Sequence, residues 1–224
     1  MSTIQIAIDG PAASGKSTAA RGLAVKLNGL YVNTGDMYRT LAWACIQHNV
    51  NPVHHPRELV CLLSKWDLRY RRQADGRLVL FFNGAPVRQE DIRAPQVAAI
   101  VSYVAQIPEL RAWMTSRQRD CASLDVPIVM EGRDIGTVIL PNAPYKFFVT
   151  ASPEERARRR LAQSDEVASG ATLAKVAADI AERDRIDSTR AVAPLKPAEE
   201  AVTVVTDGMT KEQVVDHLLS FIKH

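Results

Sequence analysis

Residues 3–18 read TIQIAIDGPAASGKST and contain the most informative pattern in the chain. The isoleucine-rich run at 3–9 is typical of a short buried strand. The pattern that begins at Lys16 is helical, because Leu23 and Leu27 fall on one face. The sequence therefore predicts a strand and a helix that are joined by a tight, glycine-containing loop.

This loop carries the motif G-x-x-x-x-G-K-S, formed by Gly10, Gly15, Lys16 and Ser17. Between a strand and a helix, the motif is the signature of a phosphate-binding P-loop. Its glycines allow a tight loop whose backbone N–H groups point at phosphate oxygens, and the helix N-terminus adds a favourable dipole. Lys16 would bring a positive charge to the β- and γ-phosphates of a nucleotide, and the Ser17 hydroxyl can ligate Mg²⁺.

Further strand-like and helical segments follow the P-loop in alternation. The expected strands after the first lie at 30–33, 126–130, 145–149 and 202–206, and two expected helices cover 36–47 and 210–222. Strands that alternate with helices favour parallel pairing and a sheet covered on both faces. We therefore expect an α/β protein with a three-layer P-loop NTPase fold and a central parallel five-stranded sheet.

Residues 66–88 interrupt this alternation. In WDLRYRR (66–72), apolar and charged residues alternate with the period of a strand, and Asp75-Gly76 is typical of a hairpin turn before RLVLFF. The sequence therefore predicts a small antiparallel insert. Helices are expected after it, at about 94–106 and 108–123.

The composition is that of an ordinary soluble protein, with 46% hydrophobic and 24% charged residues in a chain of 224. The length predicts one medium domain and leaves room for an insertion. The net charge of +3 is too weak for a typical duplex-binding surface, so we expect no nucleic acid as partner. Mild basicity fits a pocket for an anionic small molecule equally well.

The cysteines and the apolar runs favour a reducing compartment. Cys45, Cys61 and Cys121 are widely spaced and form no C-x-x-C pair, which argues against a disulfide framework or a zinc site. We expect them to be buried free thiols. No signal peptide is visible, and no apolar run reaches the ~18–20 residues of a membrane span. We therefore expect a cytoplasmic protein without a membrane partner, and nothing in the sequence demands more than a monomer.

The second predicted strand is followed by NTGDMYR at 33–39. Thr34 lies at the turn between strand and helix, where its hydroxyl could cap the helix. Tyr38 and Arg39 lie in the next turn and would face the crevice beyond the carboxyl ends of the strands, where ligands bind in open α/β sheets. The alternative is an ordinary capped helix with one solvated arginine.

The third predicted strand ends in EGRDIGT at 131–137. Gly132 permits a close turn, after which Arg133 and Asp134 would project into the same crevice. Arg133 could hold a phosphate in a bidentate grip, while the Asp134 carboxylate accepts from an amino or hydroxyl group. Alternatively, the two side chains form an ion pair with each other.

Two later segments are rich in arginine. In ERDRIDSTR (182–190), Arg183, Asp187 and Arg190 would share one helical face, although a solvated charged stripe gives the same pattern. SPEERARRR (152–160) begins with a capping box and continues with arginines that could close over phosphates or form a solvated basic helix. Beside a P-loop, several arginines fit phosphoryl transfer, which requires positive charge around the transferred group.

The motif alone does not separate a kinase from other P-loop proteins. A switch GTPase would carry a base-reading N-K-x-D motif, and none occurs. Motor and transporter ATPases have a long hydrophobic strand that ends in Asp and Glu, which VPIVMEGRD (126–134) matches only in part. A nucleotide-dependent switch without an acceptor remains the alternative from another class, and the arginine-bearing turns argue against it.

Taken together, these motifs resemble the nucleoside monophosphate kinases, and within them the bacterial cytidylate kinases. The resemblance covers nearly the whole chain, with the motifs in the family's order and spacing. GPAASGKST is shared by many P-loop proteins, whereas EGRDIGT combined with RDxxDSxRxxxPL is highly specific. Two positions depart from the family's pattern: Asn33 stands where an aspartate often precedes T-G, and Ile186 stands where some members carry arginine.

The resemblance implies a role for each candidate residue. ATP would be held by Gly10, Pro11, Ala12, Ala13, Ser14, Gly15, Lys16, Ser17 and Thr18, with Mg²⁺ on Ser17. The phosphate of CMP or dCMP would lie among Arg39, Arg133 and Arg183, near Thr34 and Tyr38. Cytosine would be read by Ser102, Arg111 and Asp134, and the ribose by Asp187 with Arg190 close by. The catalytic residues would be Lys16, Arg133, Arg183 and Arg159.

The resemblance also implies a division of the chain. The core would comprise about 1–35, 124–151 and 186–224, the nucleoside monophosphate-binding region about 36–123, and the lid about 152–170. The expected reaction is in-line transfer of the γ-phosphoryl group of ATP to CMP or dCMP. A kinase for UMP, AMP, dTMP or a small metabolite such as shikimate remains the nearest alternative.

Overall fold

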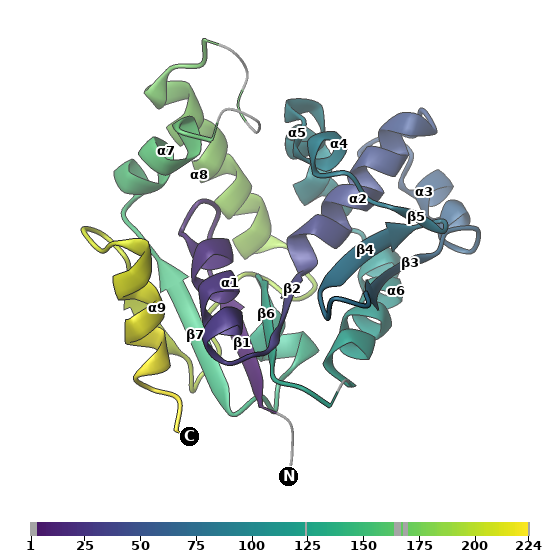
Figure 1. Cartoon of the computed structure of the whole chain (residues 1–224). Coiled ribbons are helices and arrows are strands. Elements are labelled where there is room, and N and C mark those ends of the chain that lie inside the picture. Colours follow the sequence, from purple (N-terminus) through teal and green to yellow (C-terminus); the bar gives the residue numbers. More distant parts are fainter. Residues whose placement is uncertain (1–3, 124, 164–166, 168–169, 224) are drawn as a thin grey trace.

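A five-stranded parallel sheet forms the centre of the molecule (Figure 1). The computed structural model describes residues 4–123, 125–163, 167 and 170–223. The strands are β1 Gln5–Asp9, β2 Leu30–Asn33, β6 Ile128–Gly132, β7 Tyr145–Thr150 and β8 Val202–Val205. Their order is β2-β6-β1-β7-β8, and every pairing is parallel. The predicted central sheet is thus confirmed.

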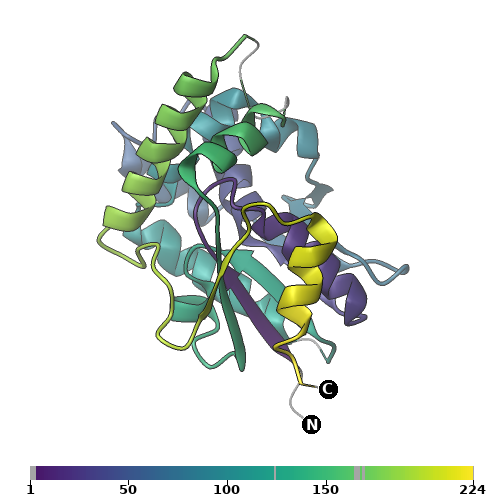
Figure 2. The same ribbon diagram turned by 90° about the vertical axis from the view of Figure 1, so that its left-hand side faces the viewer.

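The two faces of the sheet are covered by different elements. Ile6 and Ile8 of β1 pack beneath α1 (Lys16–Lys26) and α9 (Lys211–Leu219), which lie on the same side of the sheet in Figure 2. Ala7 points the opposite way and packs in a cluster with Ile135 and Ile139. This alternation follows from the two-residue period of a strand and completes the predicted three layers.

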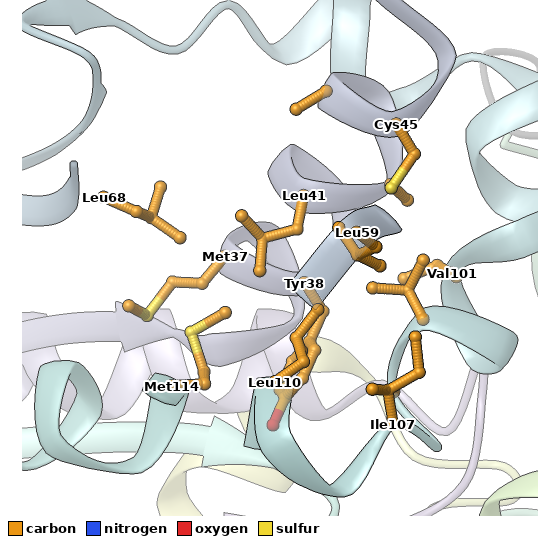
Figure 3. Close-up of a cluster of buried hydrophobic side chains, with 14 of the residues drawn as sticks. Met37, Tyr38, Leu41, Cys45, Leu59, Leu68, Val101, Ile107, Leu110 and Met114 are labelled. Carbon is orange, nitrogen blue, oxygen red and sulfur yellow. The ribbon is translucent and has the colours of Figure 1, made fainter. Parts of the chain in front are cut away.

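A second hydrophobic core, the acceptor-side core, lies outside the sheet (Figure 3). It is built by α2 Thr34–Gln47, α3 Pro56–Leu63, α5 Pro95–Val104 and α6 Pro108–Asp120. Met37 and Leu41 of α2 meet Leu110 and Met114 of α6, and all four side chains are fully buried. These four helices therefore pack against one another in a core that is separate from the packing on the central sheet.

A small antiparallel sheet joins the acceptor-side core. It consists of β3 Leu68–Arg72, β4 Leu78–Phe82 and β5 Ala85–Pro86. The predicted turn at Asp75-Gly76 is confirmed, and Gly76 adopts a φ of 83° that glycine tolerates without strain. Leu68 and Leu80 point into the core. The two-residue β5 was not predicted.

The remaining elements include α7 Pro153–Leu161 and α8 Leu173–Thr189, which carry the two arginine-rich segments. The others are α4 Gln89–Arg93, the 3₁₀ turn η1 Cys121–Ser123 and the π-helix η2 Ile135–Ile139. Ser152 caps α7 by accepting a hydrogen bond from the Glu155 backbone N–H at 3.3 Å. The predicted helix at 108–123 ends at Asp120, and the predicted helix at 94–106 covers Pro95–Val104.

One expectation about the cysteines is wrong. Cys45 and Cys121 are buried free thiols, but Cys61 is exposed. Leu59 and Leu63 occupy the buried face of α3, which turns Cys61 outward. Within the described ranges, no helix is both long and apolar enough to cross a membrane. The proposed division into core, nucleotide-binding region and lid stays a prediction, and residues 1–3, 124, 164–166, 168–169 and 224 of those ranges lie outside the described residues.

Candidate active site

A cleft of about 1500 Å³ opens at the carboxyl ends of the parallel strands. It is lined by the P-loop, α2, β4, the end of β6 and the arginine-bearing faces of α7 and α8. Most of the predicted site residues line it: Ala13, Ser14, Gly15, Lys16, Ser17, Thr18, Thr34, Tyr38, Arg39, Ser102, Arg133, Asp134, Arg159, Arg183, Asp187 and Arg190. Gly10, Pro11, Ala12 and Arg111 are predicted residues that lie behind this lining.

The P-loop is shaped by its two glycines. A side chain at Gly10 would place a Cβ 2.0 Å from the Val149 carbonyl oxygen, and Gly15 begins α1 with a φ of 91°. Lys16 is buried and donates to the Pro11 carbonyl at 2.6 Å. Burial, reinforced by the positive charge of Arg133, lowers the pKa of Lys16 well below its ordinary value. An anion in the cleft would raise the pKa of Lys16 again, because it would stabilise the ammonium form.

The turn after β2 differs from the prediction. The cap of α2 is Asn33, whose Oδ1 accepts from the Asp36 backbone N–H at 3.1 Å. Thr34 is already helical and its hydroxyl donates to the Glu131 carbonyl at 2.7 Å. Thr34 therefore ties the start of α2 to the end of β6, where Gly132 leaves it room: a Cβ there would lie 2.5 Å from the Thr34 Oγ1.

Arginines from five segments meet on the acceptor side of the cleft and form an arginine cluster. Its members are Arg39, Arg93, Arg133, Arg160 and Arg183, and each of the other four charges acts on Arg160. Burial and these neighbours lower the pKa of Arg160 to about 9, and burial followed by Arg133 lowers that of Arg183 to about 10. Among the described residues, the buried Nε of Arg183 has no hydrogen-bond partner. Five guanidinium groups gathered in this way have the charge and the donors to hold a multiply charged anion.

Arg159, one of the predicted catalytic residues, also lines the cleft but is not a member of the arginine cluster. It donates to the hydroxyl of Thr206 at 2.8 Å and to its carbonyl at 2.9 Å, and it pairs with Glu155 at 2.9 Å. The structure therefore puts Arg159 against the loop after β8, on the P-loop side. Arg160, which the prediction did not single out, is the residue of α7 that belongs to the arginine cluster.

Arg133 and Asp134 do not pair with each other. Arg133 Nε donates to the Asp187 carboxylate at 2.9 Å, so the turn after β6 is tied to α8. Burial alone would raise the pKa of Asp187, but Arg133, Arg183 and Arg190 bring it below its ordinary value. Asp187 is therefore an anion at neutral pH and holds Arg133 toward the cleft.

Asp134 lies in a second buried network. Its carboxylate accepts from Arg111 at 2.5 Å and lies 3.5 Å from Arg190. The Arg111 guanidinium also lies 5.5 Å from the centre of the Tyr38 ring. Burial raises the pKa of Tyr38 to about 12, so its hydroxyl stays protonated. Ser102 is buried and lines the same part of the cleft.

Asp9 joins the donor and acceptor sides. It ends β1 directly before the P-loop, and its two carboxylate oxygens accept from the backbone N–H groups of Ile135 at 2.8 Å and Gly136 at 2.7 Å. These groups begin the π-helix that follows Asp134. At the other end, Arg119 donates to the carbonyls of Val138 and Ile139. The π-helix that directly follows Arg133 and Asp134 is therefore held at both of its ends.

Asp9 should make stability depend on pH. Burial raises its pKa to about 6 from an ordinary 3.8. The folded chain then binds more protons than the unfolded chain between these values, so the Asp9 contribution to unfolding free energy rises as pH falls. When the pH is lowered from 7 to 5, we expect the free energy of unfolding of the wild type to rise by about 1 kcal/mol relative to that of Asp9→Asn. Urea unfolding at both pH values measures it, and a parallel pH dependence of the two proteins would contradict it.

The residues at the P-loop fit a magnesium nucleotide better than a metal alone. The described chain has no group of three or more His, Cys, Asp or Glu side chains arranged to hold a metal ion. The Ser17 hydroxyl is exposed at the start of α1, and the buried Glu131 carboxylate accepts from Tyr31 at 2.5 Å and acts on the charge of Lys16. One hydroxyl and one nearby carboxylate suit Mg²⁺ only if phosphates supply most of its ligands.

Several of these residues were not predicted. Arg93 lies on the short α4 and pairs with Asp36 of α2, which no local pattern indicated. Asp9 and Glu131 each lie at the end of a predicted strand, and that position was a usable signal for them. Arg160 could have been separated from Arg159 only by knowing which face of α7 turns toward the cleft.

Known proteins resemble this chain over its full length. The family model described as "Cytidylate kinase" matches residues 6–224. A cytidylate kinase from Geobacillus sp. (strain WCH70) is 43% identical over 219 residues, covering 98% of this chain and 96% of that protein. One from Clostridium botulinum (strain Langeland / NCTC 10281 / Type F) is 41% identical over 223 residues, covering 100% and 99%.

Among solved structures, an uncharacterized protein from Eubacterium ventriosum ATCC 27560 has a similar fold. The match has a TM-score of 0.52 at 12% identity and covers 98% of each chain, so it bears on the fold alone. The sequence matches carry more information than this structural match, because they have higher identity and include the P-loop and both arginine-bearing turns. The chain belongs to the cytidylate kinase family.

Proposed function

We propose that this protein transfers the γ-phosphoryl group of ATP to CMP and dCMP, which gives CDP and dCDP. The observation that carries the proposal is the arginine cluster opposite the P-loop, with the unpartnered Nε of Arg183 inside it. A P-loop protein without an acceptor has no use for a second buried cationic site in the same cleft. The family membership supports the same reaction.

The proposed reaction begins with the acceptor phosphate held among Arg39, Arg133 and Arg183. One of its oxygens attacks the γ-phosphorus in line, and the bond to the β–γ bridging oxygen breaks as ADP leaves. Lys16 and the arginines stabilise the charge on the transferred group. Ser17 would help to hold Mg²⁺, which would supply further charge neutralisation at the β- and γ-phosphates. No strong general base is required, because the attacking phosphate is already largely ionised.

The base and ribose contacts follow from the two buried carboxylates. Asp134 would accept from the 4-amino group of cytosine, with Arg111 fixing the carboxylate and Ser102 close by. Asp187 would accept from the ribose hydroxyls, with Arg190 beside it. Thr34 and Tyr38 would shape the wall nearest to the phosphate.

The donor side involves the whole P-loop from Gly10 to Thr18. Arg159 is proposed to act here, because its contacts with Thr206 place it beside the P-loop. Arg160 is the better candidate for the lid charge that acts on the transferred phosphoryl group. We further propose Mg²⁺ as cofactor and a monomer in the cytoplasm, with no nucleic-acid or membrane partner.

The direct test is ADP production from Mg-ATP with CMP, dCMP, UMP, AMP and dTMP offered separately at equal concentration. Strong turnover with CMP and dCMP and little with the others would support the proposal. Turnover with a different monophosphate would leave the phosphoryl transfer in place and overturn the base contacts. No stimulation by any of the five would overturn the function and point first to a small-metabolite kinase such as one for shikimate.

Asp134 should set the preference for cytosine over uracil. The carboxylate can accept from the 4-amino group of cytosine, whereas uracil presents a carbonyl oxygen there, so that two hydrogen-bond acceptors would face each other with no proton between them. We expect Asp134→Asn to lower the ratio of kcat/KM for CMP over UMP by at least about 10-fold. Steady-state kinetics with both acceptors measure the ratio. Asp120→Asn, a substitution on the outward side of α6, serves as control, and an unchanged ratio in Asp134→Asn would refute the assignment.

A further inference from the structure

A largely buried ion pair connects the two arginine-bearing helices to the tip of the P-loop. Asp184 of α8 pairs with Arg156 of α7. The other oxygen of Asp184 accepts from the Ala12 backbone N–H at 3.2 Å, and Arg156 donates to the Ala12 carbonyl at 3.2 Å. Both polar groups of one P-loop residue are therefore held by side chains that lie 144 and 172 positions away.

The held residue precedes a strained one. Ala13 has a φ of 57°, a left-handed conformation in which a Cβ crowds the following carbonyl. Such a conformation persists only where the surroundings fix it. The hydrogen bond to Asp184 fixes the peptide before Ala12, and the hydrogen bond from Arg156 fixes the peptide that leads into Ala13, which itself lines the cleft.

Apolar packing encloses the same place. Ala12 is 1% exposed and packs with Ala157 of α7 and with Val176 and Ile180 of α8. The P-loop tip therefore belongs to the small core between these helices, and water is largely excluded from it. Hydrogen bonds to charged groups in such a place hold geometry more firmly than exposed pairs do.

We propose that Asp184 and Arg156 are positioning residues that hold the Ala12–Ala13 backbone in the conformation required for the ATP phosphates. The inference rests on the proposed function, because it concerns the donor site of that reaction. Asp184 directly follows Arg183 of the arginine cluster, and Arg160 lies one helical turn beyond Arg156. The same two helices thus carry acceptor-side charges and fix the shape of the donor loop.

The test compares Asp184→Asn with Glu182→Gln. Glu182 lies on the same helix but is exposed and pairs only with Arg185 among its described contacts, at 2.7 Å. We expect Asp184→Asn to raise the KM for ATP and the Kd for ADP by about 10-fold, and to leave the KM for CMP within about 2-fold. Glu182→Gln should leave all three unchanged. If Asp184 only stabilised the fold, Asp184→Asn would lower the amount of folded enzyme without changing the donor constants more than the KM for CMP.

Relief of strain provides a second readout. Ala13→Gly removes the crowding at φ 57°, so it should lower the ATP KM of the double variant Asp184→Asn/Ala13→Gly relative to Asp184→Asn alone. If the two substitutions changed the KM for ATP by independent factors, the inference would be overturned. If Asp184→Asn does not fold, Arg156→Lys keeps the charge but loses the guanidinium fork, and we expect a rise of about 3-fold in ATP KM. An unchanged ATP KM in that variant would also overturn it.

Measurements on the wild-type enzyme distinguish a failure of the proposed function from a failure of the positioning role. If it neither binds ADP nor releases ADP from ATP in the presence of CMP, the proposed function fails. If wild type does both and Asp184→Asn has the same donor constants, only the positioning role fails.

Discussion

Replacing Lys16 with alanine should lower kcat for CMP phosphorylation by about 10³-fold. Lys16 is the one P-loop side chain whose charge can follow the transferred phosphoryl group. Its pKa is lowered by burial and by Arg133, so the free enzyme holds the ammonium at a cost. Removing it should therefore change the free energy of unfolding by no more than about 1 kcal/mol. Initial rates at saturating ATP and CMP, together with urea unfolding, measure both quantities.

Lys26→Ala is the matched control for this variant. Lys26 ends the same helix, is largely exposed and lies 3.7 Å from Asp216. It should retain wild-type kcat, because an exposed pair of this kind contributes little. If Lys16→Ala kept more than about a tenth of the wild-type kcat, the charge of Lys16 would not act in the chemical step.

Replacing Arg183 with alanine should lower kcat by about 10²-fold or more, whereas Asp187→Asn should act mainly on the KM for CMP. The guanidinium of Arg183 has a donor without a partner and a pKa lowered to about 10, both of which an anion in the cleft would correct. Asp187 carries no positive charge and already accepts from Arg133 at 2.9 Å. We expect Arg133→Ala to lower kcat by a factor similar to that of Arg183→Ala. Steady-state kinetics with varied CMP separate the two parameters.

Arg185→Ala controls for the loss of an arginine from the same helix. Arg185 is exposed and pairs with Glu182 at 2.7 Å, so its removal should leave kcat and KM unchanged. A change confined to the KM for CMP in Arg183→Ala or Arg133→Ala would mean that these arginines bind the acceptor equally well before and during the transfer.

The sheet was predictable because each of its strands is a short apolar run bounded by turn signals. The hairpin was predictable from its alternation and from Asp75-Gly76. Two short helices, α3 and α4, were not predicted, because eight and five residues offer too little periodicity. The π-helix at Ile135–Ile139 has no sequence period of its own and depends on Asp9 and Arg119, which are distant in the chain.

The candidate site was predictable where a motif fixes local geometry. The P-loop placed Lys16 and Ser17, and the strand end placed Arg133 and Asp134. The sequence could not say which partners these side chains choose, because the choice depends on helix packing. In place of the alternative Arg133–Asp134 pair, Arg133 pairs with Asp187 of α8 and Asp134 pairs with Arg111 of α6. Similarly, Asn33 caps α2 because Thr34 is drawn toward the Glu131 carbonyl.

The acceptor-side core and the packing around the sheet are separate clusters of side chains, and Tyr70 is packed against both. Its hydroxyl also donates to the Asn33 carbonyl at 3.0 Å, at the junction of β2 and α2. A chain built this way has two cooperative units that can lose their order at different free energies. Thermal motion can then loosen the helices around the acceptor-side core while the sheet below the P-loop keeps its backbone amides protected from exchange with solvent.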